Sequence, residues 1–231
     1  MHAATAAPTN VVTTVATNVV IVCYDDFTDI DVFLPWEVLN RVPQHMTRGG
    51  WRVRIVGDKS HHTSFAGLVI PMHGHLAEAN AADAVIFTSG KGARRVIEDE
   101  AWLGQFRLDP RRQLIGSMCT GAAILAKLGL LRGLTATTYP TSVELLHSLG
   151  VEVVEEPIVT HGNVTTAAGC LAGQYLTQWI IESLAGPAAA EAALASIRPV
   201  GEGCVALPSA PAKTPEPKGL TGRRQRAISE A

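Results

Sequence analysis

Hydrophobic positions along the chain are concentrated in short, almost fully apolar runs, and longer stretches of mixed character separate them. The apolar runs are rich in β-branched residues, which is typical of strands buried on both faces of a parallel sheet. The pattern predicts strands over residues 18–24, 51–57, 68–72, 83–90, 113–118 and 134–139. Two further short strands are expected within residues 151–169, joined by a turn at residues 161–163.

The mixed stretches predict helices over residues 31–42, 92–108, 120–130, 141–149 and 171–185. Strands that alternate with helices indicate an α/β fold with a parallel sheet covered on both faces. Ligands of such folds bind beyond the carboxyl ends of the strands. This rule selects the loop after Tyr24, the turn at Ser89 and Gly90, and the junction at residues 118–120 as parts of one crevice.

Changes of composition divide the chain into three parts. Residues 1–17 are rich in Ala, Thr and Val and lack the features of a signal peptide, so we interpret them as a mobile leader. Residues 18–200 are expected to form a single α/β domain. Residues 201–231 contain a Pro-rich stretch and a short basic cluster, which predicts a flexible, solvated tail.

Charge and cysteine usage restrict the function classes. A formal net charge of −2 argues against a nucleic-acid partner or an anionic membrane partner. No apolar run reaches the roughly 18 residues that span a bilayer. The four cysteines form no CxxC pair, which favours reduced thiols in a cytoplasmic protein. We expect no metal and no cofactor, since the best-spaced candidate ligands are only His73 and His75.

The segment IGSMCTGAAILAKLGLL carries the most specific chemical signal. An apolar strand ends at Met118, and small residues follow Cys119, so that the backbone can turn sharply and present the thiol to the crevice. A helix amino terminus after the thiol would also lower its pKa. The residues alone leave two interpretations equally open: Cys119 is a nucleophile, or it is a buried structural thiol.

Other candidate residues carry weaker signals. Cys23 lies inside a strand and is expected to be a core thiol, and Cys204 falls in the tail. Cys170 follows AAG and is expected near a surface with nothing nearby to activate it. The turn FTSGKG offers backbone amides at Gly90 that could form an oxyanion hole. Four aspartates crowd the loop after the first strand, and one of them could act as an acid and base: Asp25, Asp26, Asp29 and Asp31.

The stretch from residue 18 to residue 185 resembles the ThiJ/PfpI superfamily, a flavodoxin-like relative of class I glutamine amidotransferases. The matching segments are NVVIVCYDDF, TDIDVFLPWEVL, FTSGKG, SMCTGAAILAKLGLLRGLTATTYP and HGNVTTAAG. The resemblance implies a doubly wound, mostly parallel sheet with a nucleophile elbow at Cys119. It also implies a homodimer, a small-molecule substrate and no cofactor.

Details of the motifs narrow the resemblance. Members called proteases carry His directly after the cysteine, and Thr120 at this position disfavours a peptidase. The Cys-Thr-Gly elbow, with Asp31 four residues before Pro35, is similar to the isocyanide hydratase branch. This similarity implies that Asp31 is the acid and base partner of Cys119, and that amides of Gly90 and Thr120 position the developing charge.

Two positions depart from that branch. Ser89 stands where Pro-Gly-Gly is usual at the oxyanion turn, and Tyr139 stands where a His-Trp pair often follows Ala-Thr-Thr. Both residues are expected to line the substrate pocket. The resulting hypothesis is hydration of an isocyanide to an N-formamide, a lyase reaction, through a thioimidate at Cys119. The alternatives are a redox sensor that uses oxidation of Cys119, and a glyoxalase-like or amidase-like activity.

Overall fold

Seven strands form the central sheet of the computed structural model, which describes residues 16–47 and 49–201. The strand order is β10-β11-β7-β6-β1-β2-β5, and every neighbouring pair is parallel except β10 and β11. The sheet strands are β1 (Thr17–Val22), β2 (Trp51–Gly57), β5 (Gly74–His75), β6 (Ala84–Phe87), β7 (Leu114–Met118), β10 (Ile158–His161) and β11 (Val164–Ala167). This arrangement confirms the predicted α/β fold with a mostly parallel, flavodoxin-like sheet.

Two small sheets lie outside the central one. One pairs β3 (His61–Thr63) with β4 (Val69–Pro71), and the other pairs β8 (Thr135–Ala136) with β9 (Glu152–Val153). The α-helices are α1 (Asp29–Asn40), α2 (Ala93–Val96), α3 (Glu100–Leu103), α4 (Ala122–Lys127), α5 (Val143–Ser148), α6 (Gly173–Ala185) and α7 (Pro187–Ala195). Short 3₁₀ turns are η1 (Gln44–Met46), η2 (Leu76–Ala81), η3 (Cys119–Gly121), η4 (Pro140–Ser142) and η5 (Cys170–Ala172).

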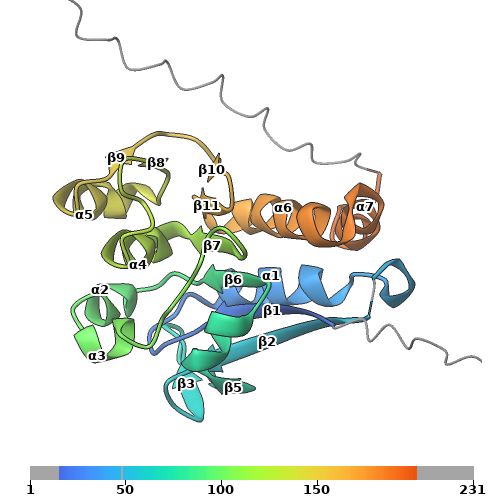
Figure 1. The fold of residues 1–231 in the computed structure, drawn as a ribbon, viewed down its shortest axis with the longest axis horizontal. Coiled ribbons are helices and arrows are strands. Elements are labelled where there is room, and N and C mark those ends of the chain that lie inside the picture. The colour runs from blue at the N-terminus through green and yellow to red at the C-terminus, as the bar shows by residue number, and fades with distance from the viewer. Residues whose placement is uncertain (1–15, 48, 202–231) are drawn as a thin grey trace, which may run out of the picture.

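Helices cover both faces of the sheet, as Figure 1 shows, with α2 to α5 on the left and α1, α6 and α7 on the right. Successive residues of a strand point to opposite faces, so the strands contribute to two separate cores. Val19 and Ile21 pack with α1, α6 and α7, whereas Val20 and Val22 pack with the helices of the other face. This double burial explains why the strand sequences are apolar at nearly every position.

The structure corrects several predicted element boundaries. Residues 92–108 form two short helices instead of one, because the Asp99 carboxylate accepts a hydrogen bond from the Trp102 amide and starts α3 anew. The strand expected over 134–139 is reduced to β8, which pairs with β9 outside the central sheet. Residues 151–169 hold three strands where two were expected. Helix α7 was not predicted, although Pro187 at its first turn is a common start.

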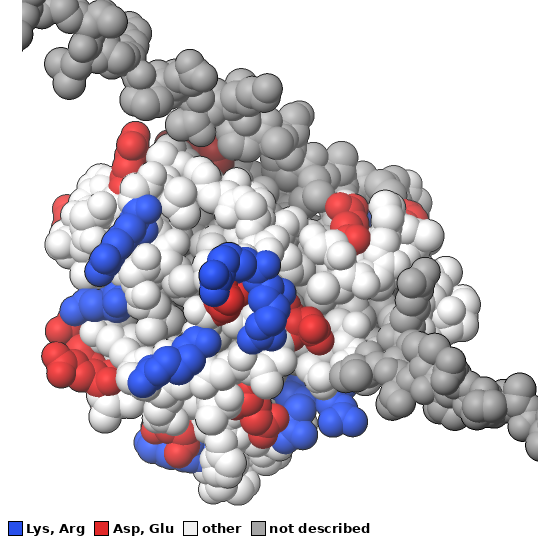
Figure 2. Space-filling view, viewed as in Figure 1, with Lys and Arg blue, Asp and Glu red and all other residues white. Residues whose placement is uncertain are grey.

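The domain boundaries are only partly visible. Thr17, assigned to the leader, already belongs to β1. Residues 1–15 of the leader and residues 202–231 of the predicted tail, with Cys204, lie outside the described residues. Figure 2 shows acidic and basic side chains interspersed on one face of the molecule. Within the described ranges, no helix is long and apolar enough to cross a membrane.

Candidate active site

The carboxyl end of β7 leads into a sharp turn that carries Cys119. Cys119 has a φ of 44°, in the left-handed region that costs a non-glycine residue about 1–3 kcal/mol. The Cys119 carbonyl accepts a hydrogen bond from the Thr138 hydroxyl at 2.9 Å, which holds the turn. A Cβ atom at Gly121 would lie 2.6 Å from the carbonyl oxygens of Phe87 and Thr88, so only glycine fits there. The strained elbow expected from the sequence is confirmed.

Asp31 lies beside this elbow, in the first turn of α1. Its side chain is completely buried, whereas the side chains of Asp25 and Asp26 are 31% and 49% exposed. The Ser89 hydroxyl donates a hydrogen bond to Asp31 Oδ2, and a carboxylate oxygen of Asp31 lies within 4.8 Å of the Cys119 sulfur. Unlike Asp25 and Asp26, Asp31 is therefore both buried and close to the Cys119 sulfur.

A second thiol belongs to the same cluster, and sequence reasoning missed it. The Cys170 sulfur lies within 4.8 Å of both the Cys119 sulfur and an oxygen of Asp31. Cys170 follows β11, which pairs with β7, so both cysteines lie beyond the carboxyl ends of adjacent parallel strands. The expectation that nothing nearby would activate Cys170 agrees with its raised pKa, but nothing in the sequence indicated that Cys170 lies beside Cys119 and Asp31. The available signal was its position three residues after the end of β11, in a segment interpreted as a separate hairpin.

The electrostatics of the cluster oppose ionisation. Burial raises the pKa of Asp31, although hydrogen bonds from Ser89, Cys170 and Cys119 partly offset this effect. Burial and the neighbouring Asp31 charge raise the pKa of Cys119. Burial and the hydrogen bond with Asp31 raise the pKa of Cys170 to about 11. The sequence predicted a lowered thiol pKa, and this prediction is wrong: burial disfavours the Cys119 thiolate and the Asp31 charge repels it, so the pKa is raised.

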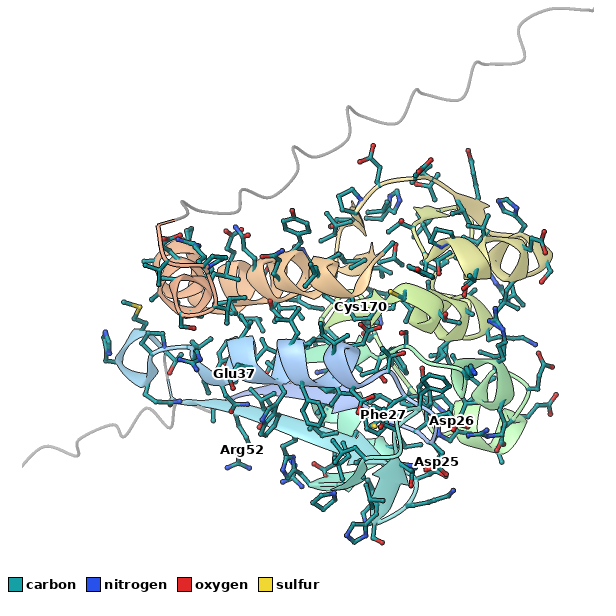
Figure 3. All side chains as sticks on the ribbon, turned by 180° about the vertical axis from the view of Figure 1, so that it is seen from behind. Asp25, Asp26, Phe27, Glu37, Arg52 and Cys170 are labelled. Atoms are coloured by element: carbon teal, nitrogen blue, oxygen red, sulfur yellow. The ribbon has the colours of Figure 1, made fainter. Side chains whose placement is uncertain are left out.

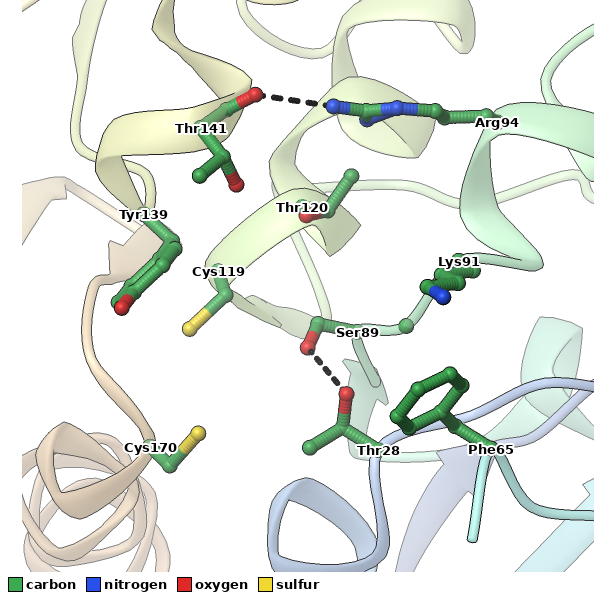
Figure 4. A pocket seen from close by; sticks show the side chains of 11 residues that line it. Thr28, Phe65, Ser89, Lys91, Arg94, Cys119, Thr120, Tyr139, Thr141 and Cys170 are labelled. Carbon is green, nitrogen blue, oxygen red and sulfur yellow. Dashed lines mark hydrogen bonds between the residues drawn. The ribbon is translucent and has the colours of Figure 1, made fainter. Parts of the chain in front are cut away.

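The Cys119 sulfur faces a pocket with a volume of about 460 Å³. One part of its lining follows β6 and the elbow: Ser89, Gly90, Lys91, Arg94, Cys119 and Thr120. The remaining lining residues are Thr28, Phe65, Tyr139, Thr141 and Cys170. Figure 4 shows the Cys119 and Cys170 sulfurs pointing toward the same space. A cavity of this size suits a small organic molecule.

The residues that the sequence nominated for this pocket occupy it. Gly90 has a φ of 144°, and an added Cβ would lie 2.1 Å from the Asp26 carbonyl oxygen, so the turn requires glycine. The Thr120 hydroxyl shares a hydrogen bond of 2.8 Å with the Ser142 hydroxyl. Ser89 joins the pocket to Asp31, and Tyr139 is half exposed at the pocket surface. Asp31 itself is not among the lining residues, but it accepts a hydrogen bond from Ser89 and lies within 4.8 Å of the Cys119 and Cys170 sulfurs.

The other aspartates of the β1 loop have different partners. Asp25 accepts hydrogen bonds from Lys59 and from the Thr63 amide and pairs with His62, and Asp26 pairs with Arg95. Figure 3 shows Asp25 and Asp26 on the loop after β1, apart from Cys170. These contacts tie the loop to its neighbours and leave both carboxylates outside the thiol cluster.

Asp31, Cys119 and Cys170 also form the set of side chains best placed to hold a metal ion among the described residues. Two sulfurs and one carboxylate oxygen would suit a thiophilic ion such as Zn²⁺. Such an ion would occupy the nucleophile, so the trio serves either metal binding or thiol chemistry at one time.

Comparison with known proteins places this geometry in a family context. The sequence model of the DJ-1/PfpI family matches residues 17–183. The chain is similar to the isonitrile hydratase of Pseudomonas putida, with 28% identity over 158 residues, 68% of this chain and 67% of the relative. It is also similar to a deglycase of Pyrococcus abyssi, with 23% identity over 147 residues, 63% of this chain and 86% of the relative.

Solved structures show the same fold. A ThiJ/PfpI family protein from Pseudomonas syringae superposes with a TM-score of 0.71 at 23% identity, covering 82% of this chain and 78% of that one. Schizosaccharomyces pombe DJ-1 superposes with a TM-score of 0.66 at 18% identity, covering 79% of this chain and all of the other.

Proposed function

Because the chain belongs to the DJ-1/PfpI family, we propose that it uses Cys119 as the nucleophile of a small-molecule enzyme, and that its reaction is hydration of an isocyanide. The observation that carries this proposal is the Cys119–Asp31 pair at a strained elbow that opens into a pocket. The similarity to an isonitrile hydratase at 28% identity supports the choice of substrate.

The first half of the reaction joins the substrate to sulfur. The Cys119 thiolate attacks the terminal carbon of the isocyanide, a C–S bond forms, and that carbon receives a proton from the Asp31 carboxyl group. The product is a thioimidate. The raised pKa of Asp31 suits this step, because a buried carboxyl keeps a proton that it can deliver.

The second half adds water and releases sulfur. Asp31, now a carboxylate, accepts a proton from a water molecule that attacks the thioimidate carbon. The hydroxyl proton of this adduct passes to the substrate nitrogen, the C–S bond breaks with its electron pair going to sulfur, and an N-formamide leaves with Cys119 restored as a thiolate. The backbone around Gly90 and Thr120, beside the sulfur, would stabilise charge that develops during the attack.

The test is direct incubation of the purified protein with cyclohexyl isocyanide, with formamide formation followed by mass spectrometry. We expect turnover by the wild type and none by Cys119→Ser. A folded wild-type protein that forms no formamide would contradict the proposal. Consumption of a dicarbonyl compound by the same sample would then favour a glyoxalase-type reaction on the same thiol.

A second candidate function is redox sensing, and the position of Cys170 favours it. A peroxide would oxidise the Cys119 thiol to a sulfenic acid and leave as the corresponding alcohol or water. The Cys170 thiol would then attack the Cys119 sulfur, form a disulfide and release water. Dilute peroxide should remove two hydrogens from the intact mass of the wild type, whereas Cys170→Ser should gain oxygen at Cys119. Resistance of Cys119 to peroxide would exclude this function.

A further inference from the structure

All the charged side chains that line the pocket are basic. Lys91 and Arg94 both line the pocket, and none of the described lining residues is a carboxylate. Apolar surface from Phe65 and Tyr139 lies in the same lining. Lys91 and Arg94 are solvent-exposed, so they present two neighbouring positive charges at the open side of the pocket, where their attraction for an anion is partly screened by salt.

Both cationic groups are held in place by neighbours that leave their charge uncompensated. The Lys91 ammonium lies 4.1 Å from the centre of the Phe65 ring. The Arg94 guanidinium donates a hydrogen bond of 2.9 Å to the Thr141 carbonyl oxygen, and Figure 4 shows this contact across the pocket from Cys170. Within the described ranges, neither side chain forms a salt bridge.

The nearest cations outside the pocket behave differently. Arg95, the next residue along the chain, pairs with Asp26 at 3.1 Å, and Lys59 pairs with Asp25. Neither Arg95 nor Lys59 lines this pocket. Arg95 and Lys59 thus have acidic partners, whereas Lys91 and Arg94 have none among the described residues.

We propose that Lys91 and Arg94 form a subsite for an anionic group of the substrate, a carboxylate in the simplest case. Cys119 would attack the electrophilic carbon at one end of this molecule while the two cations hold the anion at the other. This inference rests on the proposed function. It specifies the substrate class: a small electrophile, such as an isocyanide, that also bears a carboxylate.

Alkylation of Cys119 tests the subsite without any need for turnover. Iodoacetate and iodoacetamide are nearly equal in size and differ by one charge. In each case the Cys119 thiol loses its proton to solvent, the sulfur forms a bond to the CH₂ carbon, the C–I bond breaks, and iodide leaves with the electron pair. The rate of each reagent at Cys119 is measured by peptide mass spectrometry, in the wild type and in a Cys170→Ser background that removes the competing thiol.

We expect the iodoacetate-to-iodoacetamide rate ratio at Cys119 to exceed that of N-acetylcysteine amide at the same pH. Lys91→Met and Arg94→Met should each lower the ratio about threefold to tenfold, the size of one charge acting across a partly screened pocket. Arg95→Gln is the matched control and should leave the ratio unchanged. The iodoacetamide rate reports any general disturbance of the thiol, and 1 M salt should reduce the wild-type ratio.

An equal ratio in the wild type, Lys91→Met and Arg94→Met would overturn the subsite. If a charge-dependent ratio is found in a protein that hydrates no isocyanide, the proposed reaction fails and the subsite stands. If isocyanides are hydrated, isocyanoacetate should have a lower KM than its methyl ester, and Lys91→Met should remove most of that difference. An unchanged KM difference in Lys91→Met would also contradict the subsite.

Discussion

The chain leaves β1 and β7 at the same edge of the sheet, and a cysteine is the first residue after each strand. Cys23 and Cys119 are both buried, and burial raises the pKa of both thiols. Cys23 continues the ladder by donating its amide to the Val56 carbonyl at 2.8 Å. Cys119 instead turns to a φ of 44° and lines the pocket.

The comparison shows that residue type, strand order and thiol pKa do not by themselves create a site. The backbone turn does, because it moves one sulfur out of the sheet and into a cavity. The turn depends on small residues after β7, above all Gly121, which packs against the carbonyl oxygens of the β6 end. After β1, by contrast, Cys23 is followed by Tyr24, a large buried residue whose hydroxyl donates a hydrogen bond to the Thr88 carbonyl oxygen.

The largest expected effect separates the two cysteines directly. Cys119→Ser should lower isocyanide hydration on the order of a thousandfold or more, since the atom that forms the covalent bond is lost. Cys23→Ala should keep the wild-type kcat and lower the free energy of unfolding by about 1–2 kcal/mol, because it only leaves a small cavity. Steady-state kinetics and urea denaturation of both variants check this. A large loss of kcat in Cys23→Ala would mean that the strand end of β1 also contributes chemistry.

The next prediction compares aspartates of the β1 exit. Asp31→Asn should slow hydration about a hundredfold, because an amide cannot deliver or accept the proton. Asp25→Asn is the matched control and should change kcat little, since Asp25 lies outside the thiol cluster. Measurement of kcat for both variants, with circular dichroism to verify folding, decides between them. Equal losses in the two variants would contradict the assignment of Asp31.

A third prediction concerns the thiol pKa itself. The Asp31 charge raises the pKa of Cys119, so its removal should lower that pKa. Alkylation of Cys119 by iodoacetamide should therefore be several times faster at pH 8 in Asp31→Asn than in the wild type, although turnover is slower. The rate of modification between pH 6 and pH 10 measures the shift. A slower alkylation in Asp31→Asn would indicate that Asp31 acts as a base toward the thiol.

The sequence was sufficient for the fold and for the elbow because both depend on local patterns. Buried parallel strands need continuous apolar runs, and an elbow needs small residues at fixed offsets from Cys119. Asp31 could be separated from its three acidic neighbours only through the family resemblance, since the residues themselves show no difference in burial.

Cys170, Lys91 and Arg94 could not be assigned from the sequence, because their roles depend on which strands are adjacent. Cys170 reaches Asp31 only because β11 lies beside β7 in the sheet. The raised thiol pKa was missed for the same reason: desolvation is a property of the assembled core and leaves no mark on the residues near Cys119.

The smallest expected effect concerns the structural role of the β1 exit. Although burial opposes it, hydrogen bonds from Lys59 and His62 hold the pKa of Asp25 well below its usual range. Because the pKa of Asp25 is lower in the folded protein, its ionised carboxylate stabilises the fold fully above the unfolded-state pKa of about 4. This stabilisation is lost progressively as the pH falls from about 4 toward the lower folded-state pKa. Asp25→Asn should thus lower the urea midpoint slightly at pH 6, and the difference from wild type should narrow at pH 3. An equal difference at both pH values would show that Asp25 does not anchor this loop through its charge.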